Sequence, residues 1–332
     1  MSAREFAFSF LGQYEKERGH VQIKLPKALA DSNLDQREKA LATELVYGVL
    51  RSRLSLDWLI REFSSKKTKN PDPDIQNILR LGLYQLLYLD RVPDHAAVDT
   101  TVKIAKTHLH PSVAKFVNAI LRSAGRAKGK LPWPDRDKNE ALFLSVFYSH
   151  PRWLVDFWLF ELGVNTTEAL LVSGNERPRV TLRVNTLKTS RKKLVEVLEG
   201  YDIHSEVGQL CPESVIIKSF IPGSILDEGL VYVQNEASIA VGHIVEPSAG
   251  QTVIDLCAGP GGKTTHLAQL MENKGKIFAV DVSADRLSLI DQNSRRLGID
   301  IIELIKGDAT EKLSLEVADN VLVDAPCTGL GV

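Results

Sequence analysis

The stretch Thr252-Val-Ile-Asp-Leu-Cys-Ala-Gly-Pro-Gly-Gly-Lys-Thr264 joins an apolar strand to a glycine-rich loop and the start of a helix. The strand is expected to cover 252–256, and the helix to begin at about Thr264. Three glycines in the loop allow backbone amides to approach a ligand closely at a helix N-terminus. Strand and helix patterns then alternate to the end of the sequence, which predicts an α/β domain with a doubly wound, Rossmann-like parallel sheet.

Two well-known phosphate-binding loops can be compared with these letters. A P-loop needs a glycine five residues before Gly262, and that position is Cys257. The dinucleotide fingerprint matches Gly259 and Gly261 but requires glycine or alanine where this chain has Thr264. The loop therefore predicts a nucleoside-binding site without a requirement for pyrophosphate.

Acidic residues follow two further strands of the predicted sheet. Asp281 comes directly after the strand 276–280, where a carboxylate can accept hydrogen bonds from both ribose hydroxyls. Asp308 follows the third strand and can receive an adenine amino group. Either residue alone reads better as a turn or cap residue, but two of them behind a glycine-rich loop favour a nucleoside site.

The fourth strand, 320–323, leads to Asp324 and then to Pro326 and Cys327. Carboxyl ends of parallel strands form the ligand-binding edge of this kind of sheet. A cysteine fixed at that edge by a proline indicates a chemical role, whereas Cys211 reads as a packing residue.

The first ~125 residues show helical periodicity and capping signals and no alternation of period two, so an all-helical front part is expected. Asp35 and Glu38 have capping-box spacing. A second strong helix should cover 75–89, Asp94 should cap a third, and Pro111 should open a fourth.

The composition changes twice along the chain. The segment Gly125–Asp137 is rich in glycine, proline and basic residues and reads as a linker. A small α/β module should follow, with a short helix after Ser149, an extended run at 180–184, a helix at 190–198 and a strand at 214–218. The predicted domains are residues 1–130, 131–245 and 246–332.

The net charge of −1 conceals an asymmetry. Residues 1–150 hold 24 Lys and Arg against 17 Asp and Glu, whereas the remainder holds 17 against 25. A basic front half favours contact with a polyanion such as RNA, although a solvated charged face is the alternative. By charge alone, the candidate RNA contacts are Arg51, Arg53, Lys66, Lys67 and Lys69.

Targeting signals are absent from the sequence pattern. The first residues are interrupted by charges, and no apolar run approaches the roughly 20 residues of a membrane span. The three cysteines are few and widely separated, which fits a reducing cytoplasm better than disulfides or a zinc site. We expect a cytoplasmic monomer with no metal and no membrane partner.

The combined motifs resemble those of the RNA 5-methylcytosine methyltransferases. In the Sun/Fmu (RsmB) branch of this family, a helical domain similar to the antitermination factor NusB precedes the catalytic domain. The matching segments are His95–Val98, Phe116–Arg122, Leu182–Asn185, Val231–Ser238, Cys257–Lys263, Asp281, Gly307–Ala309 and Asp324–Gly331.

This resemblance implies methyl transfer from S-adenosylmethionine to carbon 5 of a cytosine in 16S ribosomal RNA, on a target that is single-stranded or flipped out. That carbon is a poor nucleophile, so a thiolate must add at carbon 6, and Asp324 is a possible contact of the cytosine ring. Cys327 corresponds to a family cysteine that assists product release. The implied cofactor contacts are Cys257, Ala258, Gly259, Pro260, Gly261, Gly262, Lys263, Asp281, Asp308 and Asp324.

The family's attacking cysteine lies in a later motif, and this sequence ends at Val332 without a matching residue. The fourth strand would also remain an unpaired edge, so we interpret the methyltransferase domain as truncated. The alternative is a non-catalytic RNA-binding or antitermination-like protein. A nucleotide hydrolase is a third hypothesis, supported only by the letters Gly-Lys-Thr at 262–264.

Overall fold

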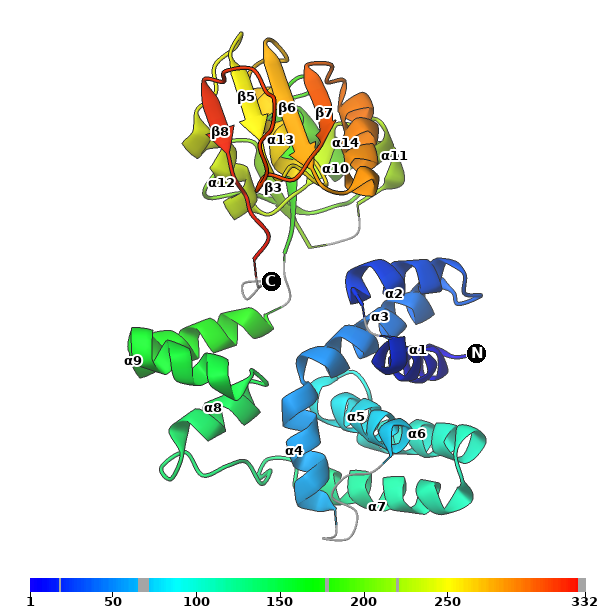
Figure 1. The fold of residues 1–332 in the computed structure, drawn as a ribbon. Helices are drawn as coiled ribbons and strands as arrows, with labels where there is room; N and C mark the ends of the chain where they lie inside the picture. The colour runs from blue at the N-terminus through cyan, green and yellow to red at the C-terminus, as the bar shows by residue number, and fades with distance from the viewer. Residues whose placement is uncertain (18, 65–71, 177–178, 219–220, 328–332) are drawn as a thin grey trace. The chain divides into compact units, whose positions relative to one another are not determined.

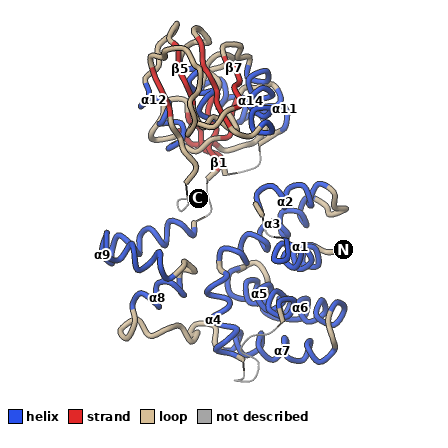
Figure 2. Tube along the Cα trace, viewed as in Figure 1, coloured by secondary structure: helices blue, strands red, loops and turns tan. Residues whose placement is uncertain are grey.

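The front unit of the chain, Met1–Glu176, consists of helices and loops in its described residues (Figures 1 and 2). The computed structural model describes residues 1–17, 19–64, 72–176, 179–218 and 221–327, so Lys66, Lys67 and Lys69 lie outside it. The expected all-helical front part is confirmed. Its helices are α1 (Ala3–Glu17), α2 (Val21–Ala30), α3 (Gln36–Arg51), α4 (Arg53–Phe63), α5 (Pro73–Tyr88), α6 (Asp94–His108), α7 (Pro111–Arg126), α8 (Glu140–Phe147) and α9 (Arg152–Asn175).

The helix starts follow the sequence signals with one exception. Asp35 caps α3 by accepting a hydrogen bond of 2.8 Å from the Glu38 amide, as predicted. The Glu38 carboxylate accepts from the Ala3 amide at 2.7 Å, so it also satisfies the start of α1. The predicted cap at Asp94 is wrong, because the extended backbone of Pro93 occupies the cap position and Asp94 is the first helical residue. A carboxylate there still favours the helix dipole.

The predicted linker after α7 is packed against the helices. The Trp58 indole donates a hydrogen bond of 2.8 Å to the Pro132 carbonyl oxygen, and the Trp133 ring meets the Phe147 ring edge-on. The segment therefore lies with the front unit, whose boundary falls after Glu176. The three-part division at residues 130 and 245 stays a prediction.

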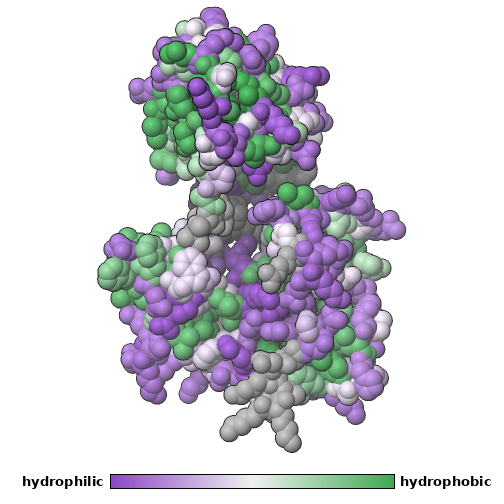
Figure 3. Space-filling model, in the orientation of Figure 1, coloured by the Kyte–Doolittle hydropathy of each residue, from purple (hydrophilic) through white to green (hydrophobic). Residues whose placement is uncertain are grey.

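Helix α9 is longer than the short helix expected after Ser149. It bends at Gly163, where a φ of 72° is accessible at low cost only to glycine. Trp153, Phe157 and Phe160 in its first half are 59%, 53% and 85% exposed. Figure 3 shows apolar side chains reaching the surface over α9.

The back unit, Arg177–Val332, holds all strands of the described residues (Figure 2). Its first sheet is antiparallel with the order β2-β3-β1-β4. The predicted strands at 180–184 and 214–218 and the helix at 190–198 are confirmed, whereas two three-residue strands were too short to show a pattern. The elements are β1 (Val180–Val184), α10 (Arg191–Gly200), β2 (Ser205–Val207), β3 (Ser214–Ile217), α11 (Gly223–Asp227) and β4 (Val231–Val233).

The second sheet is parallel with the order β7-β6-β5-β8, which confirms the α/β fold expected from the sequence. The first and last of these strands in the chain, β5 and β8, are neighbours in the sheet. Successive strands are therefore added first on one side of β5 and then on the other, which makes β5 the point where the strand order reverses. The elements are α12 (Glu236–Val245), β5 (Thr252–Asp255), α13 (Gly262–Leu270), β6 (Lys276–Asp281), α14 (Ala284–Leu297), β7 (Ile302–Lys306) and β8 (Asn320–Leu322).

Alternate strand residues fill the two faces of the parallel sheet. Val253 and Ile277 pack on one face with side chains of α12, α13 and α14. Ile254 and Phe278 pack on the other with the segment 313–318. None of the described helices is both long and apolar enough to span a bilayer.

Candidate active site

The glycine-rich loop connects β5 to α13 as predicted, although the helix begins at Gly262 and not at Thr264. Gly261 caps α13 with a φ of 100°, a left-handed conformation that favours glycine. A Cβ atom on Gly259 would lie 2.5 Å from the Arg286 Cβ and 2.7 Å from the Asp281 Oδ2. Both glycines are therefore required by the path of the backbone.

Asp281 holds this loop in place. Its Oδ2 accepts a hydrogen bond of 3.0 Å from the Gly259 amide, and its Oδ1 accepts one of 2.9 Å from the Ser283 amide. The side chain is only 4% exposed. Carboxylate oxygens have further lone pairs, so these bonds leave acceptor capacity for a ligand.

A cavity of about 300 Å³ lies beside the glycine loop. Three segments of the back unit line it: the end of β5 with the loop itself, the end of β4 with the start of α12, and Asp324 after β8. Of the predicted site residues, the structure brings together here Cys257, Ala258, Gly259, Pro260, Gly262, Lys263 and Asp324. Gly261 and Asp281 are not part of the lining, but Gly261 caps α13 and Asp281 accepts a hydrogen bond from the loop.

Besides Gly261 and Asp281, two further predicted site residues lie outside the lining of this cavity. Asp308 accepts hydrogen bonds of 2.9 and 2.7 Å from the Thr310 amide and hydroxyl, and these bonds lower the pKa of its carboxyl. That arrangement is a local turn. Cys327 is exposed, and Thr328 to Val332 lie outside the described residues.

Lys263 and Asp324 form an ion pair across the cavity. Lys263 is in the first turn of α13, and Asp324 follows β8, the strand that pairs with β5. The ion pair therefore connects the start of the helix to the segment after β8. The Lys263 side chain is 18% exposed and that of Asp324 is 53% exposed. Sequence reasoning selected both residues but did not predict their contact.

Asp255, at the end of β5, was missed by sequence reasoning. It is fully buried, and its Oδ2 accepts a hydrogen bond of 2.7 Å from the Thr264 hydroxyl. Its Oδ1 has no hydrogen-bond partner among the described residues. Burial raises the pKa of this carboxyl to about 6. The available signal was an aspartate inside an otherwise apolar strand.

Arg183, on β1, was also missed and is 1% exposed. Its Nη1 donates to the Gln234 Oε1 and to the Gly262 carbonyl oxygen, each at 2.5 Å, and its Nη2 donates to the Thr265 hydroxyl at 2.9 Å. The guanidinium also lies over the Tyr232 ring. Burial lowers the pKa of Arg183 to about 9. This side chain anchors the antiparallel sheet to the start of α13.

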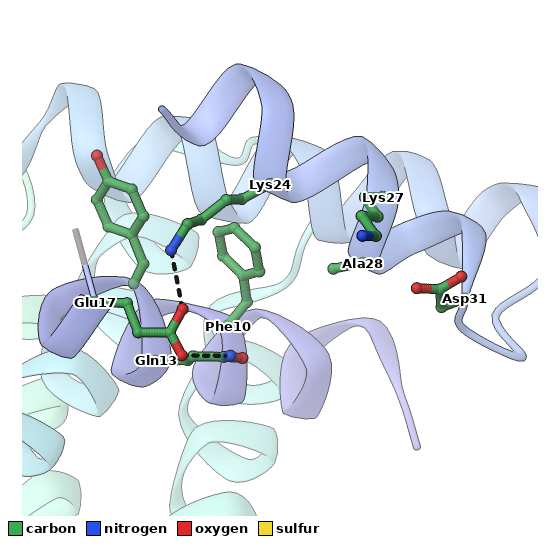
Figure 4. A pocket seen from close by; sticks show the side chains of 8 residues that line it. Phe10, Gln13, Glu17, Lys24, Lys27, Ala28 and Asp31 are labelled. Atoms are coloured by element: carbon green, nitrogen blue, oxygen red, sulfur yellow. Dashed lines mark hydrogen bonds and ion pairs between the residues drawn. The ribbon is translucent and has the colours of Figure 1, made fainter. Parts of the chain in front are cut away.

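A separate cavity of about 320 Å³ lies between α1 and α2 of the front unit (Figure 4). The Glu17 carboxylate accepts hydrogen bonds of 2.9 Å from Lys24 and from Gln13 at its edge, and Phe10 forms an apolar wall. These side chains already satisfy one another. We assign no chemistry to this cavity.

A parallel sheet with a glycine-rich loop after its first strand and acidic residues after later strands defines the nucleoside-cofactor class of α/β proteins, which includes methyltransferases. Comparison of the chain with protein-family models narrows this class to particular families. Residues 1–126 match the NusB family, residues 150–223 match the ferredoxin-like domain of the RsmF/B-like methyltransferases, and residues 242–332 match 16S rRNA methyltransferase RsmB/F.

The chain belongs to the ribosomal RNA small subunit methyltransferase B family, a family of S-adenosylmethionine-dependent methyltransferases. It is 36% identical over 336 residues to a probable ribosomal RNA small subunit methyltransferase B of Bacillus subtilis, covering 100% of this chain and 74% of the relative. A Synechocystis protein of the same description is 35% identical and is covered to 75%. The crystal structure of PH0851 superposes with a TM-score of 0.74 at 28% identity, covering 98% of this chain and 75% of that one. The family resemblance inferred from the motifs is confirmed.

Proposed function

We propose that this protein transfers a methyl group from S-adenosylmethionine to carbon 5 of a cytosine in 16S ribosomal RNA. The observation that carries the proposal is the glycine-loop cavity in a chain that aligns from end to end with ribosomal RNA small subunit methyltransferases B. We further propose a cytoplasmic monomer with the three domains 1–130, 131–245 and 246–332.

The residues around the cavity fit an adenosyl cofactor. Glycines at 259, 261 and 262 leave three positions of the loop without side chains, and a Cβ on Gly262 would lie 3.3 Å from the Tyr232 ring. Asp281 has acceptor capacity for ribose hydroxyls, and the amides at the start of α13 favour negative or polar groups. When bound, S-adenosylmethionine supplies an electrophilic methyl group on a sulfonium centre. The proposed cofactor contacts are those named from the sequence, 257–263, Asp281, Asp308 and Asp324.

Asp324 and Cys327 are proposed to act on the cytosine. Asp324 is half exposed at the cavity, where it can accept a hydrogen bond or donate one near the ring nitrogen. Lys263 pairs with it and thereby keeps it oriented until the base arrives. Cys327, three residues further along the same segment, is proposed to assist product release.

The front unit is proposed to bind the ribosomal RNA. Of the arginines selected by charge, Arg53 pairs with Glu15 at 3.0 Å, and Arg51 donates to the Asn175 carbonyl oxygen at 3.4 Å. These bonds reduce their availability to phosphates. Lysines on α6 and α7 offer a better supported surface, because Lys103, Lys106 and Lys115 are exposed there.

The two rival functions are not favoured. Relatives that match this chain over its whole length are described as methyltransferases, which speaks against a purely RNA-binding role. A nucleotide hydrolase would need the Lys263 ammonium for phosphates, whereas Asp324 holds it here.

Methyl transfer can be tested with the protein purified from its native cell. It would be incubated with methyl-labelled S-adenosylmethionine and with 16S ribosomal RNA from cells that lack the enzyme. We expect label at a single cytosine, located by bisulfite sequencing, and no transfer by the Asp324→Asn variant. Cofactor binding without any labelled cytosine would overturn the proposal.

A further inference from the structure

Three side chains from different elements converge in the back unit, away from the lining of the cofactor cavity. Glu213 precedes β3, His243 lies on α12 and His266 lies on α13. The Nε2 atoms of His243 and His266 lie 2.8 and 2.6 Å from the same oxygen, Glu213 Oε1. One ligand atom from each residue lies within 4.8 Å of the other two. The sequence could not reveal this cluster, because its members are 23 to 53 positions apart.

The hydrogen bonds of this cluster are incomplete. His266 is fully buried, yet neither of its ring nitrogens has a hydrogen-bond partner among the described residues. Its Nε2 lies 2.6 Å from Glu213 Oε1, an oxygen that the His243 Nε2 also contacts. A buried nitrogen left in this way costs free energy. A metal ion at about 2.0–2.2 Å from each atom would satisfy both, and it would hold nitrogen and oxygen roughly 3.3 Å apart, so the side chains move slightly apart to admit it.

The chemistry of the three side chains suits a metal ion. Neutral imidazole nitrogens and a carboxylate oxygen are the forms that bind a divalent metal ion.

We propose that Glu213, His243 and His266 bind one divalent transition-metal ion, with zinc as the first candidate. Two imidazoles and a carboxylate are a zinc ligand set, whereas magnesium and calcium prefer oxygen ligands. The His243 side chain is 37% exposed, which leaves an approach for the ion and for a water as further ligand. This departs from the metal-free protein expected from the sequence.

The ion would have a structural role. It would tie the antiparallel sheet, through Glu213, to α12 and α13 of the methyltransferase domain. His266 is one helical turn after Gly262, so the ion would fix the helix whose first turn forms part of the glycine loop. The proposal does not rest on the proposed catalytic function, since none of the three residues lines the cofactor cavity.

Metal titration of the full chain tests the site. The protein, with any polyhistidine tag removed, is stripped with EDTA and titrated with Co²⁺, whose visible absorption reports on its ligands. We expect one equivalent of Co²⁺ to bind, Zn²⁺ to displace it, and Zn²⁺ to raise Tm by several degrees. Glu213→Gln and His243→Gln should each weaken binding at least tenfold. His204→Gln, at an exposed histidine of the same unit, is the matched control and should leave binding unchanged.

Two results would overturn the proposal. The first is a folded wild-type protein that shows no Co²⁺ bands and whose Tm does not respond to Zn²⁺. The cluster would then be a His-Glu-His contact without metal. The second is wild-type affinity in the His243→Gln variant, which would place the ion elsewhere. His243 is partly exposed, so this variant decides the question even if Glu213→Gln does not fold.

Discussion

The Nη1 atom of Arg183 on β1 lies 2.5 Å from the carbonyl oxygen of Gly262, the first residue of α13. A buried cation of the antiparallel sheet thus fixes the helix that carries the glycine loop of the parallel sheet. Gln269 on the same helix donates a hydrogen bond of 2.9 Å to the Val184 carbonyl oxygen, one residue along β1. The two sheets are therefore coupled at the proposed cofactor site.

The Arg183→Met variant should lose about 2–3 kcal/mol of the free energy of unfolding, because buried acceptors are left without their donor. Cofactor affinity should fall with it, since the Gly262 carbonyl is no longer held. Urea unfolding and calorimetric titration with S-adenosylhomocysteine measure the two effects. Arg179→Met, at an exposed arginine just before the same strand, is the control. Equal stability of the two variants would contradict the coupling.

Sequence reasoning found the parts of the site that lie close together in the chain. The loop 257–263 follows β5, and Asp281 is the last residue of β6. Strand ends of a parallel sheet meet at one edge, so the proximity of the two could be predicted. Arg183 and Glu213 could not be found in this way. They come from another sheet, and their contacts with α13 depend on how two layers pack. Asp255 was missed for a different reason. In the sequence, a buried aspartate within an apolar strand looks the same as an exposed aspartate that interrupts the strand.

The Gly259→Ala variant should disturb the loop. The added Cβ would lie 2.5 Å from the Arg286 Cβ and 2.7 Å from the Asp281 carboxylate, so the loop or α14 must move. We expect a loss of about 1–3 kcal/mol in stability and at least a tenfold loss of cofactor affinity. Gly200→Ala is a matched control, because nothing lies within 4 Å of its added Cβ. Unchanged cofactor affinity in Gly259→Ala would show that the cofactor does not depend on this loop.

Asp255 should give the stability a pH dependence of defined sign. Burial raises the pKa of its carboxyl from 3.8 to about 6, so the folded state binds more protons than the unfolded state between these values. Stability therefore falls as the pH rises through this window, by up to about 3 kcal/mol in total.

The Asp255→Asn variant lacks this titration but keeps an oxygen that can accept from Thr264. Relative to wild type, the variant should gain stability between pH 4 and pH 7, as measured by urea unfolding at several pH values. Asp300→Asn, at an exposed carboxylate, is the comparison. A constant difference between wild type and Asp255→Asn across this range would mean that Asp255 is already ionised at pH 4.

RNA binding by the front unit should depend on salt. Each phosphate neutralised by a lysine contributes about −0.9 to the slope of log K against log salt for a duplex, and about −0.7 for a single strand. The Lys103→Gln/Lys106→Gln double variant of α6 should therefore reduce that slope by about 1–2 and weaken binding, while cofactor affinity stays the same. Lys192→Gln/Lys193→Gln on α10, equally exposed in the acidic half, is the matched control. Filter binding of a 16S ribosomal RNA fragment at several salt concentrations provides the slopes. If both pairs reduce the slope equally, the RNA contacts the back unit as well; if neither does, α6 is not part of the RNA-binding surface.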